Sequence, residues 1–442
     1  MSEWNNNKLS YLVDIRVSNV DKKIYPNKKK VKLCNYMDAY SNDYITSNIS
    51  YSEGSVDLNE LNRFRLTVND VIITKDSETP EDIAVSSVVT EEIEDLVCGY
   101  HLAILRPREN RINGPFLMHK LKLPQVQKYF FRMASGSTRY GLTIGGIENT
   151  ELSHPPLPHQ RKIARILTTV DNIIEKTESA IEKYKAIKQG MMHDLFTRGI
   201  DVKTGKLRPS YEDAPELYKE TELGVVPKDW EVGTLDMIAF VNPSSKPHNL
   251  SNYDLVSFIP MECVSNDATL ISTYKKKVSE VLQGFTHFRD GDILFAKITP
   301  CMENGKGALV NGLKNGFGYG STEFHVLRPI KQQSTLFVYY LTTSSMFRLK
   351  AEGKMTGSAG QQRVPSDFVT KYRIGIPLLK EQEIIGNRLN TASIKIKCEQ
   401  KYLSKNQKLK QALMQDLLTG KKEVTPDPED FDNEQLKMNS EQ

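Results

Sequence analysis

The sequence contains nearly the same pattern of residues twice. Arg106-Pro107 returns as Arg328-Pro329 at an offset of 222 residues, which is about half of the 442-residue chain. Ser135-Gly136-Ser137 returns as Thr356-Gly357-Ser358 at nearly the same offset. An internal duplication of this length predicts two similar domains related by approximate two-fold symmetry. A molecule with that symmetry suits a duplex target that is contacted at two places.

Each copy ends in a long helical pattern in which apolar residues recur in alternating steps of four and three. The first stripe is Ile163, Leu167, Val170, Ile174, Thr177, Ile181, Tyr184, Lys188, Met191 and Leu195, and the second is Ile385, Leu389, Ala392, Ile396, Glu399, Leu403, Asn406, Lys410, Leu413 and Leu417. A period of 3.5 residues predicts coiled-coil helices. Gly199 and Gly420 follow the last stripe residues, as helix C-caps do. The polar stripe members either fix the register or extend their heads out of the seam.

The two helices are expected to pack on each other as a rod of about 50 Å. The second variable region begins soon after the first helix ends, which favours an antiparallel pair with one globular domain at each end. A parallel pair stays open, because residues 200–229 are long enough to span such a rod at about 3.3 Å per residue.

The residues that precede each helix predict mixed α/β domains. Segments 65–75 and 287–297 alternate as strands around a turn, and 100–107 and 321–329 are strands that end at a proline. One short helix is expected after each of these, followed by glycine- and serine-containing loops at 135–146 and 356–367. The frame is common to both copies, whereas the loop contents differ.

Composition excludes several classes of protein. Apolar residues make up 39% and charged residues 26%, which is ordinary for a globular chain, and no apolar run is long enough for a membrane span. The five cysteines are widely spaced and form no C-x-x-C motif, so buried free thiols are expected rather than zinc or disulfides. The net charge of +4 is mild. The lysine runs 28–32 and 275–277 either add to a basic surface or are ordinary solvated loops.

Taken together, these segments resemble the specificity subunit of type I restriction-modification systems. PLPHQRKIARILTTVDNIIEK and PLLKEQEIIGNRL are similar to the starts of the family's conserved helices, and GMMHDLFTRGI and ALMQDLLTGK to their ends. ELGVVPKDWEVGTL (222–235) resembles the opening of a target-recognition domain, and FRDGDILFAKITPCMENGKGALV (288–310) its central hairpin. The resemblance covers most of the chain but departs at the N-terminus, where this opening is missing, and is weak over 76–99.

The resemblance implies an α/β (α+β) fold, in which two target-recognition domains are joined by a long antiparallel two-helix coiled coil. It places the domains at 1–156 and 230–377, the helical regions at 157–199 and 378–420, a linker at 200–229 and a flexible tail at 421–442. It also implies a non-catalytic, cytoplasmic, prokaryotic DNA-recognition subunit that reads a bipartite site. Its partners would be two methyltransferase subunits, which carry S-adenosylmethionine, and restriction motor-nuclease subunits, with no cofactor, metal or membrane contact on this chain.

Base contacts in such a domain are expected from polar side chains on exposed loops. The candidates are Ser137, Arg139, Tyr140, Ser358, Gln361, Gln362 and Arg363 on the two loops, and Lys75, Lys297, Thr299, Asn304 and Lys306 on the segments after the preceding strands. Gln362 suits adenine and Arg363 suits guanine, whereas the lysines suit phosphate. Each of these side chains is about as well explained as an ordinary exposed loop residue.

Two other functions remain open at this point. A nuclease or methyltransferase fused to a coiled coil would need an active site, yet the chain has no G-x-x-x-x-G-K-[ST], no H-E-x-x-H and no Asn/Asp-Pro-Pro-Tyr/Phe motif. An adaptor whose duplicated domains bind only protein would not show a sequence-dependent footprint on duplex DNA.

Overall fold

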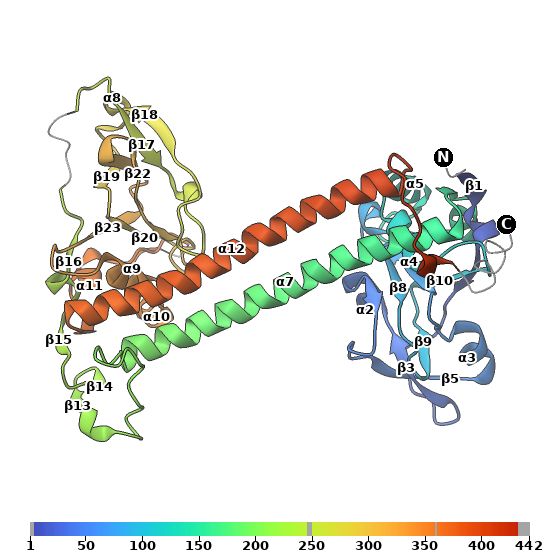
Figure 1. Cartoon of the computed structure of the whole chain (residues 1–442), viewed down its shortest axis with the longest axis horizontal. Helices are drawn as coiled ribbons and strands as arrows, with labels where there is room; N and C mark the ends of the chain where they lie inside the picture. The colour runs from blue at the N-terminus through green and yellow to red at the C-terminus, as the bar shows by residue number, and fades with distance from the viewer. Residues whose placement is uncertain (1–3, 245–249, 359, 432–442) are drawn as a thin grey trace. The chain divides into compact units, whose positions relative to one another are not determined.

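The computed structural model describes residues 4–244, 250–358 and 360–431. The chain divides into two compact units: unit 1 comprises residues 1–178 and 401–442, and unit 2 comprises residues 179–400. Helices α7 (Leu157–Thr197) and α12 (Leu379–Leu417) are the two longest helices in Figure 1. Each unit therefore contains one variable region and one end of both long helices.

Both predicted apolar stripes are confirmed. Every one of their twenty positions is buried or half-buried, polar members included. On the opposite side of the helices, residues such as Lys176 and Lys408 are exposed. Burial with a period of 3.5 residues is the signature of helices that pack on one another along a seam. Gly199 and Gly420 adopt the positive φ of a C-cap, at 66° and 76°.

The long helices run antiparallel within each unit. In unit 1 the Lys410 ammonium lies 2.6 Å from the Asp171 carboxylate, and Leu167 shares a core cluster with Leu417. In unit 2 the Lys395 ammonium lies 5.5 Å from the centroid of the Tyr184 ring. Residue numbers thus fall along α12 as they rise along α7, which confirms the expected direction.

The two equivalent lysines of the seam have different surroundings. Lys410 forms its ion pair with Asp171, which is 8% exposed and also accepts a hydrogen bond from the Tyr44 hydroxyl at 2.8 Å. Lys188 lies 5.3 Å from the Tyr340 ring centroid, and its burial lowers its pKa. Only the first of these positions is a buried ion pair, so it is the one that can fix the pairing of the helices.

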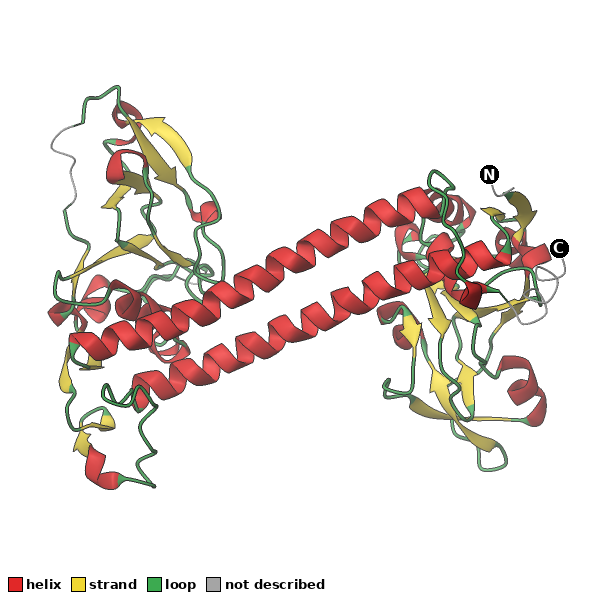
Figure 2. Cartoon of the chain, viewed as in Figure 1, coloured by secondary structure: helices red, strands yellow, loops and turns green. Residues whose placement is uncertain are grey.

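In unit 1 a five-stranded sheet and a three-stranded sheet form the variable region (Figure 2). The larger sheet has the order β2 (Val13–Val17), β10 (Leu102–Pro107), β6 (Val71–Thr74), β8 (Ser86–Val89), β4 (Tyr44–Ile45), and the smaller has β5 (Ser52–Val56), β3 (Lys29–Cys34), β9 (Leu96–Cys98). Strand β1 (Asn5–Lys8) pairs with β12 (Glu151–His154), and β7 (Asp76–Ser77) with β11 (Tyr140–Gly141). The helices are α1 (Leu9–Leu12), α2 (Tyr36–Ser41), α3 (Leu58–Phe64), α4 (Gly114–Leu121), α5 (Pro124–Met133) and α6 (Ile144–Glu148).

In unit 2 two four-stranded sheets form the variable region. One has the order β16 (Ala239–Val241), β23 (Phe324–Pro329), β20 (Ile293–Ala296), β21 (Gly307–Leu309), and the other β18 (Tyr274–Lys277), β17 (Leu255–Ile259), β22 (Phe317–Gly320), β19 (Thr286–Arg289). Strand β15 (Glu231–Thr234) pairs with β24 (Arg373–Ile376), and β13 (Tyr218–Thr221) with β14 (Gly224–Pro227). The helices are α8 (Val278–Val281), α9 (Thr335–Thr343), α10 (Ser345–Glu352) and α11 (Ser366–Thr370).

The prediction of paired strands around the turns at Asp70 and Asp292 was wrong. Strands β19 and β20 lie in different sheets, and in the first copy only the part after the turn, β6, is a strand. The Asp70 carboxylate accepts two hydrogen bonds from the Arg106 guanidinium, at 2.8 and 2.7 Å, and Asp292 accepts two from Arg328, both at 2.7 Å. This buried charge pair holds the turn against the central strand, so the chain changes sheet there.

The single helix expected after each central strand is two helices. Helix α4 ends at Leu121 and α5 begins at Pro124, which cannot continue a preceding helix because it lacks an amide hydrogen. Helices α9 and α10 are separated by Ser344, whose hydroxyl accepts a hydrogen bond from the Phe347 amide as an N-cap. The break gives each copy a second short helix, α5 or α10, that the pattern alone did not reveal.

A buried glutamine joins the variable region of unit 1 to the first turn of its long helix. The Gln160 amide donates to the Pro155 carbonyl at 2.8 Å and accepts from the Asn113 amide at 2.9 Å. Asn113 is the N-cap of α4, so one side chain ties the start of α7 to the start of α4. Gln160 is only 1% exposed.

Gln382 makes the same two bonds in unit 2. It donates to the Pro377 carbonyl at 2.8 Å and accepts from the amide of Ser334, the N-cap of α9, at 3.1 Å. Gln382 is also 1% exposed. The two copies therefore share the same connection between domain and helix.

The glycines that end the long helices each lie against a tryptophan. A Cβ on Gly199 would come within 2.5 Å of the Trp230 ring, and a Cβ on Gly420 within 2.9 Å of the Trp4 ring. Trp230 and Trp4 precede the equivalent strands β15 and β1, which pair with β24 and β12. The domain opening that the N-terminal sequence lacks is therefore represented in the fold by Trp4 and β1.

The described part of the C-terminal segment contacts the start of α7. The Asp427 carboxylate accepts hydrogen bonds from Lys162 and Arg165, and the Asp430 carboxylate lies 3.0 Å from Arg165. Residues 432–442 of the expected flexible tail lie outside the described residues. Among the described helices, none combines the length and apolar composition needed to cross a membrane.

We predict that Gln382→Ala destabilises the protein by about 1–3 kcal/mol, because it leaves the Pro377 carbonyl and the Ser334 amide without their buried partner. Urea unfolding measures this loss. Gln407→Ala, at an exposed position of the same helix, is the control and should change the unfolding free energy by less than about 0.5 kcal/mol. Equal effects of the two substitutions would contradict the role assigned to Gln382.

A second prediction concerns Lys120, whose ammonium donates to the Leu418 carbonyl at 2.6 Å and whose pKa is lowered by burial to about 8. The unfolded chain keeps this proton up to a pH near 10.5, so the contribution of Lys120 to the unfolding free energy rises with pH between about 8 and 10.5. Relative to Lys120→Met, the wild type should gain up to about 1.4 kcal/mol per pH unit in this window. Urea unfolding at pH 7.5, 9 and 10 tests this, and a constant difference would contradict it.

Candidate nucleic-acid interface

In unit 2 the structure brings the two candidate segments of the second copy together. The Val364 amide donates to the Lys297 carbonyl at 2.9 Å, and the Thr299 amide donates to the Gln362 carbonyl at 3.0 Å. The segment after β20 therefore runs beside the end of the 356–367 loop. Lys297, Thr299, Gln362 and Arg363 are consequently neighbours, although more than sixty residues separate the two pairs in sequence.

The two ends of this loop are joined by backbone hydrogen bonds. Thr356 and Arg363 exchange two backbone hydrogen bonds, of 3.0 and 2.8 Å. Gly357 has a φ of 130°, and a Cβ there would meet the Gln361 carbonyl at 2.8 Å, so the turn requires glycine. The candidates between these ends, Ser358, Gln361 and Gln362, are exposed. These exposed side chains could contact a ligand, and the loop ends that carry them are joined by hydrogen bonds.

Arg363 is engaged within the unit. Its guanidinium contacts the Glu323 carboxylate through Nη2 at 2.7 Å and Nε at 2.9 Å, and Nη1 donates to the Gln361 carbonyl at 3.0 Å. The hydrogen bonds from Arg363 lower the pKa of Glu323. Contact between Arg363 and guanine, the predicted role, would therefore require it to exchange a carboxylate for a base edge.

The turn that carries the other candidates is held from α10 by Arg348. This buried guanidinium donates to the carbonyls of Met302 and Lys306, at 3.0 and 3.2 Å, and lies 4.4 Å from the Phe295 ring centroid. Burial lowers its pKa to about 10. Asn304, between the anchored residues, is exposed, whereas the Lys306 ammonium donates to the Met261 carbonyl at 3.1 Å.

Unit 1 repeats this construction. The Leu142 amide donates to the Lys75 carbonyl at 2.9 Å, as Val364 does to Lys297. Ser135 and Gly141 exchange backbone hydrogen bonds of 3.1 and 3.0 Å, and Gly136 has a φ of 146°. A Cβ on Gly136 would meet the Arg139 carbonyl at 1.9 Å. In both copies, a glycine-dependent hairpin is hydrogen-bonded to the residue that follows β6 or β20.

The exposed contents of the first loop differ from those of the second. Ser137 and Arg139 are exposed, and Tyr140 is half-buried in β11. The Lys75 ammonium lies 3.2 Å from Asp76, whose other carboxylate oxygen lies 2.7 Å from His101. This carboxylate and Arg139 line a hollow of about 360 Å³. The first surface is thus partly acidic.

The roles of Arg348 in α10 and of Gln127 in α5 were not identified from the sequence. At the position equivalent to Arg348, Gln127 of α5 donates to the carbonyls of Ala84 and Leu121, at 3.3 and 2.8 Å. A polar residue at the equivalent position of α5 and α10 could have indicated these roles. That comparison is possible only when each predicted helix is known to be two helices.

Lysines of both runs make contacts within their own units. Lys28, Lys29 and Lys30 each lie within 4.0 Å of a carboxylate, at 2.6, 2.6 and 3.9 Å for the nearest partner. Lys276 lies 4.2 Å from the Phe258 ring centroid. The first run is therefore largely neutralised within unit 1.

The described residues contain no group of three or more His, Cys, Asp or Glu side chains arranged to hold a metal ion. All five cysteines are free. Cys34, Cys98 and Cys263 are buried as expected, but Cys301 is half-buried and Cys398 is exposed on α12, so the expectation of five buried thiols was wrong. Cys398 lies outside the apolar stripe of α12, and its side chain is exposed.

A family model described as the Type I restriction modification DNA specificity domain matches residues 1–183 and 227–410. The EcoAI type I restriction enzyme specificity subunit of Escherichia coli is 42% identical over 186 residues, which are 42% of this chain and 31% of that protein. The chain thus spans about a third of the length of this relative. A putative MjaX specificity subunit of Methanocaldococcus jannaschii is 26% identical over 376 residues, covering 82% of this chain and 80% of its own.

Among solved structures, the S subunit of a type I restriction-modification system from M. genitalium has a similar fold. The TM-score is 0.56 at 13% sequence identity, with 94% of this chain and 96% of that chain covered. At this level of identity, the likeness concerns the fold alone.

We predict that Glu323→Gln tightens DNA binding by roughly three- to tenfold at low salt, because it removes a charge that repels phosphate and releases the Arg363 guanidinium. Arg363→Ala should instead weaken binding to the preferred duplex by about 1–3 kcal/mol, with little change for unrelated duplexes. Fluorescence anisotropy with labelled duplexes measures both. Equal weakening on preferred and unrelated duplexes would identify Arg363 as a phosphate contact.

Proposed function

The chain belongs to the family of type I restriction-modification DNA specificity proteins, and from this premise we propose that it recognises a bipartite duplex sequence as a non-catalytic subunit. Residues 1–156 and 230–377 are the two target-recognition domains, and each contacts one half of the site. Residues 157–199 and 378–420 are the helical regions, 200–229 the linker and 421–442 the tail.

One observation carries this proposal: both copies present a glycine-dependent hairpin, hydrogen-bonded to the residue after β6 or β20, with different exposed side chains. The backbone frame is common, whereas Ser137 and Arg139 stand in one loop and Ser358, Gln361 and Gln362 in the other. A fixed backbone with variable polar side chains suits readout of base edges. Two such loops with different contents suit two different half-sites.

The long helices would set the spacing between the half-sites and bind the methyltransferase subunits. Helix α12 leaves Tyr402 and Leu409 exposed, at 47% and 45%, and these residues are seven positions apart, on one helical face. An apolar pair on the outer face of a seam helix fits the docking of partner helices. S-adenosylmethionine would bind to those methyltransferase subunits, and restriction would need a separate motor-nuclease subunit in the same prokaryotic cytoplasm.

The proposal is tested by mapping methylated adenines across the host genome with and without this chain. A split motif that disappears with the chain is the expected result, and footprinting on that motif should protect two separate patches. Methyl transfer or cleavage by the purified chain alone would favour an enzyme. A lack of any sequence-dependent footprint would favour an adaptor that binds only protein.

The spacing role predicts the effect of shortening both helices. Removing seven residues from each keeps the 3.5-residue seam in register and shortens the helices by about 10 Å, which corresponds to roughly three base pairs. The methylated motif should then have a gap about three base pairs shorter, with both half-sites unchanged. Methylation mapping measures the gap. Altered half-sites with an unaltered gap would contradict the role of the helices as a spacer.

A further inference from the structure

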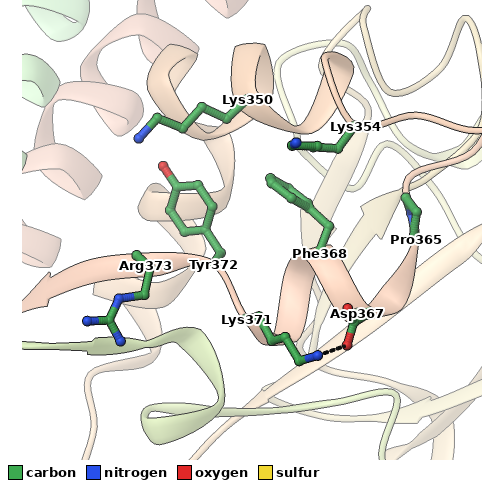
Figure 3. A pocket seen from close by; sticks show the side chains of 8 residues that line it. All are labelled: Lys350, Lys354, Pro365, Asp367, Phe368, Lys371, Tyr372 and Arg373. Atoms are coloured by element: carbon green, nitrogen blue, oxygen red, sulfur yellow. Dashed lines mark ion pairs between the residues drawn. The ribbon is translucent and has the colours of Figure 1, made fainter. Parts of the chain in front are cut away.

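A basic hollow of about 480 Å³ lies in unit 2, beside the second candidate loop (Figure 3). Lys350 of α10 and Lys354 lie on one side of it, and Lys371 and Arg373, which flank the start of β24, on the other. The aromatic rings of Phe368 and Tyr372 stand between the two sides. Two chain segments, 350–354 and 371–373, thus bring four cationic side chains to one concave surface.

These cations are only partly compensated. Lys371 pairs with Asp367 at 2.9 Å, but both side chains are 71% exposed, and such a pair contributes little. Arg373 pairs with Glu222. Within the described part of the chain, neither Lys350 nor Lys354 has a carboxylate within 4.0 Å; the Lys350 ammonium lies 5.6 Å from the Tyr372 ring centroid. The hollow therefore has a surplus of positive charge.

The hollow adjoins the loop at both of its ends. Lys354 is two residues before Thr356, and Pro365 of the hollow is two residues after Arg363. Thr356 and Arg363 are joined by two backbone hydrogen bonds, so both ends of the loop meet at the edge of the hollow. A duplex that contacted Gln361 and Gln362 would bring its sugar-phosphate backbone close to these lysines.

The first copy shows that the fold does not need this charge. Counted from the N-caps Leu123 and Ser344, the positions of Lys350 and Lys354 are Tyr129 and Met133 in the first copy. The C-cap Lys371 of α11 corresponds to the C-cap Asn149 of α6, and Arg373, the first residue of β24, to Glu151, the first residue of β12. Three neutral residues and one acid occupy the same scaffold, so the lysines serve something other than folding.

We propose that this hollow binds phosphate groups of the DNA backbone beside the half-site contacted by the second recognition domain. The inference rests on the proposed function and adds to it a contact that supplies affinity without reading sequence. Lysine suits this task because its ammonium is a compact charge on a long flexible stem, which can follow a phosphate without demanding a fixed geometry. The first domain, which lacks these cations, would bind its half-site with fewer phosphate contacts.

The test compares the wild-type chain with Lys350→Gln/Lys354→Gln/Lys371→Gln on a duplex that carries the motif found by methylation mapping. The slope of log Kd against log salt should fall by about one for each phosphate that the variant no longer neutralises, and thus by about two to three. Discrimination between the motif and a scrambled duplex should stay within about twofold, because no side chain that reads a base is removed.

A second measurement locates the contact. Methylphosphonate linkages, which carry no charge, are placed singly along the backbone beside each half-site. At the phosphates held by the hollow, the wild type should lose roughly threefold or more in affinity, whereas the triple variant should lose nothing further. These positions should all lie beside one half-site, the one whose recognition changes when the second loop is altered.

The control is Lys22→Gln/Lys23→Gln/Lys32→Gln, which removes the same charge from exposed positions of the first variable region. An equal fall in slope for both triple variants would mean a general charge effect and would overturn the proposal. An unchanged slope for the hollow variant would also overturn the proposal. If that variant in addition no longer assembled with the methyltransferase subunit, the hollow would instead bind an acidic protein surface. If the wild type itself gave no two-patch footprint, the proposed function would fail first.

Discussion

Packing of the two apolar stripes of α7 and α12 is the constraint on which the rest of each unit depends. Neither helix can expose its stripe to water, so each unit is assembled from segments that are distant in sequence: in unit 1 the start of α7 lies beside the end of α12. The buried pair of Asp171 and Lys410 adds a polar contact that only one register satisfies. Gln160 and Gln382 then attach each variable region to the first turn of its own helix.

The parts of this fold that could be predicted are those with a period or a repeat. The stripes follow from spacing, and the central strands β10 and β23 were expected as strands that end at a proline. The change of sheet at Asp70 and Asp292 could not be predicted, because it depends on a charge pair with arginines 36 residues away. Local pattern carries no information on such a partner.

The candidate site shows the same division. Duplication was enough to select the two loops, and the structure places each of them beside the segment that follows β6 or β20. Whether any candidate contacts a base stays a prediction. The ion pair between Arg363 and Glu323 could not be predicted from the sequence, because the two residues are 40 positions apart. Arg348 and Gln127 were missed for a related reason: their role appears only once the preceding helix is seen to break.

The chain has only two tryptophans, and each stands at the end of a long helix: Trp4 against Gly420 in unit 1, and Trp230 against Gly199 in unit 2. Trp230 is 2% exposed and donates its indole hydrogen to Glu381 at 3.1 Å, whereas Trp4 is half-buried. The protein therefore carries one intrinsic fluorophore at each helix terminus. With either indole replaced by phenylalanine, the emission of the other would report on a single terminus during titration or denaturation, without any attached dye.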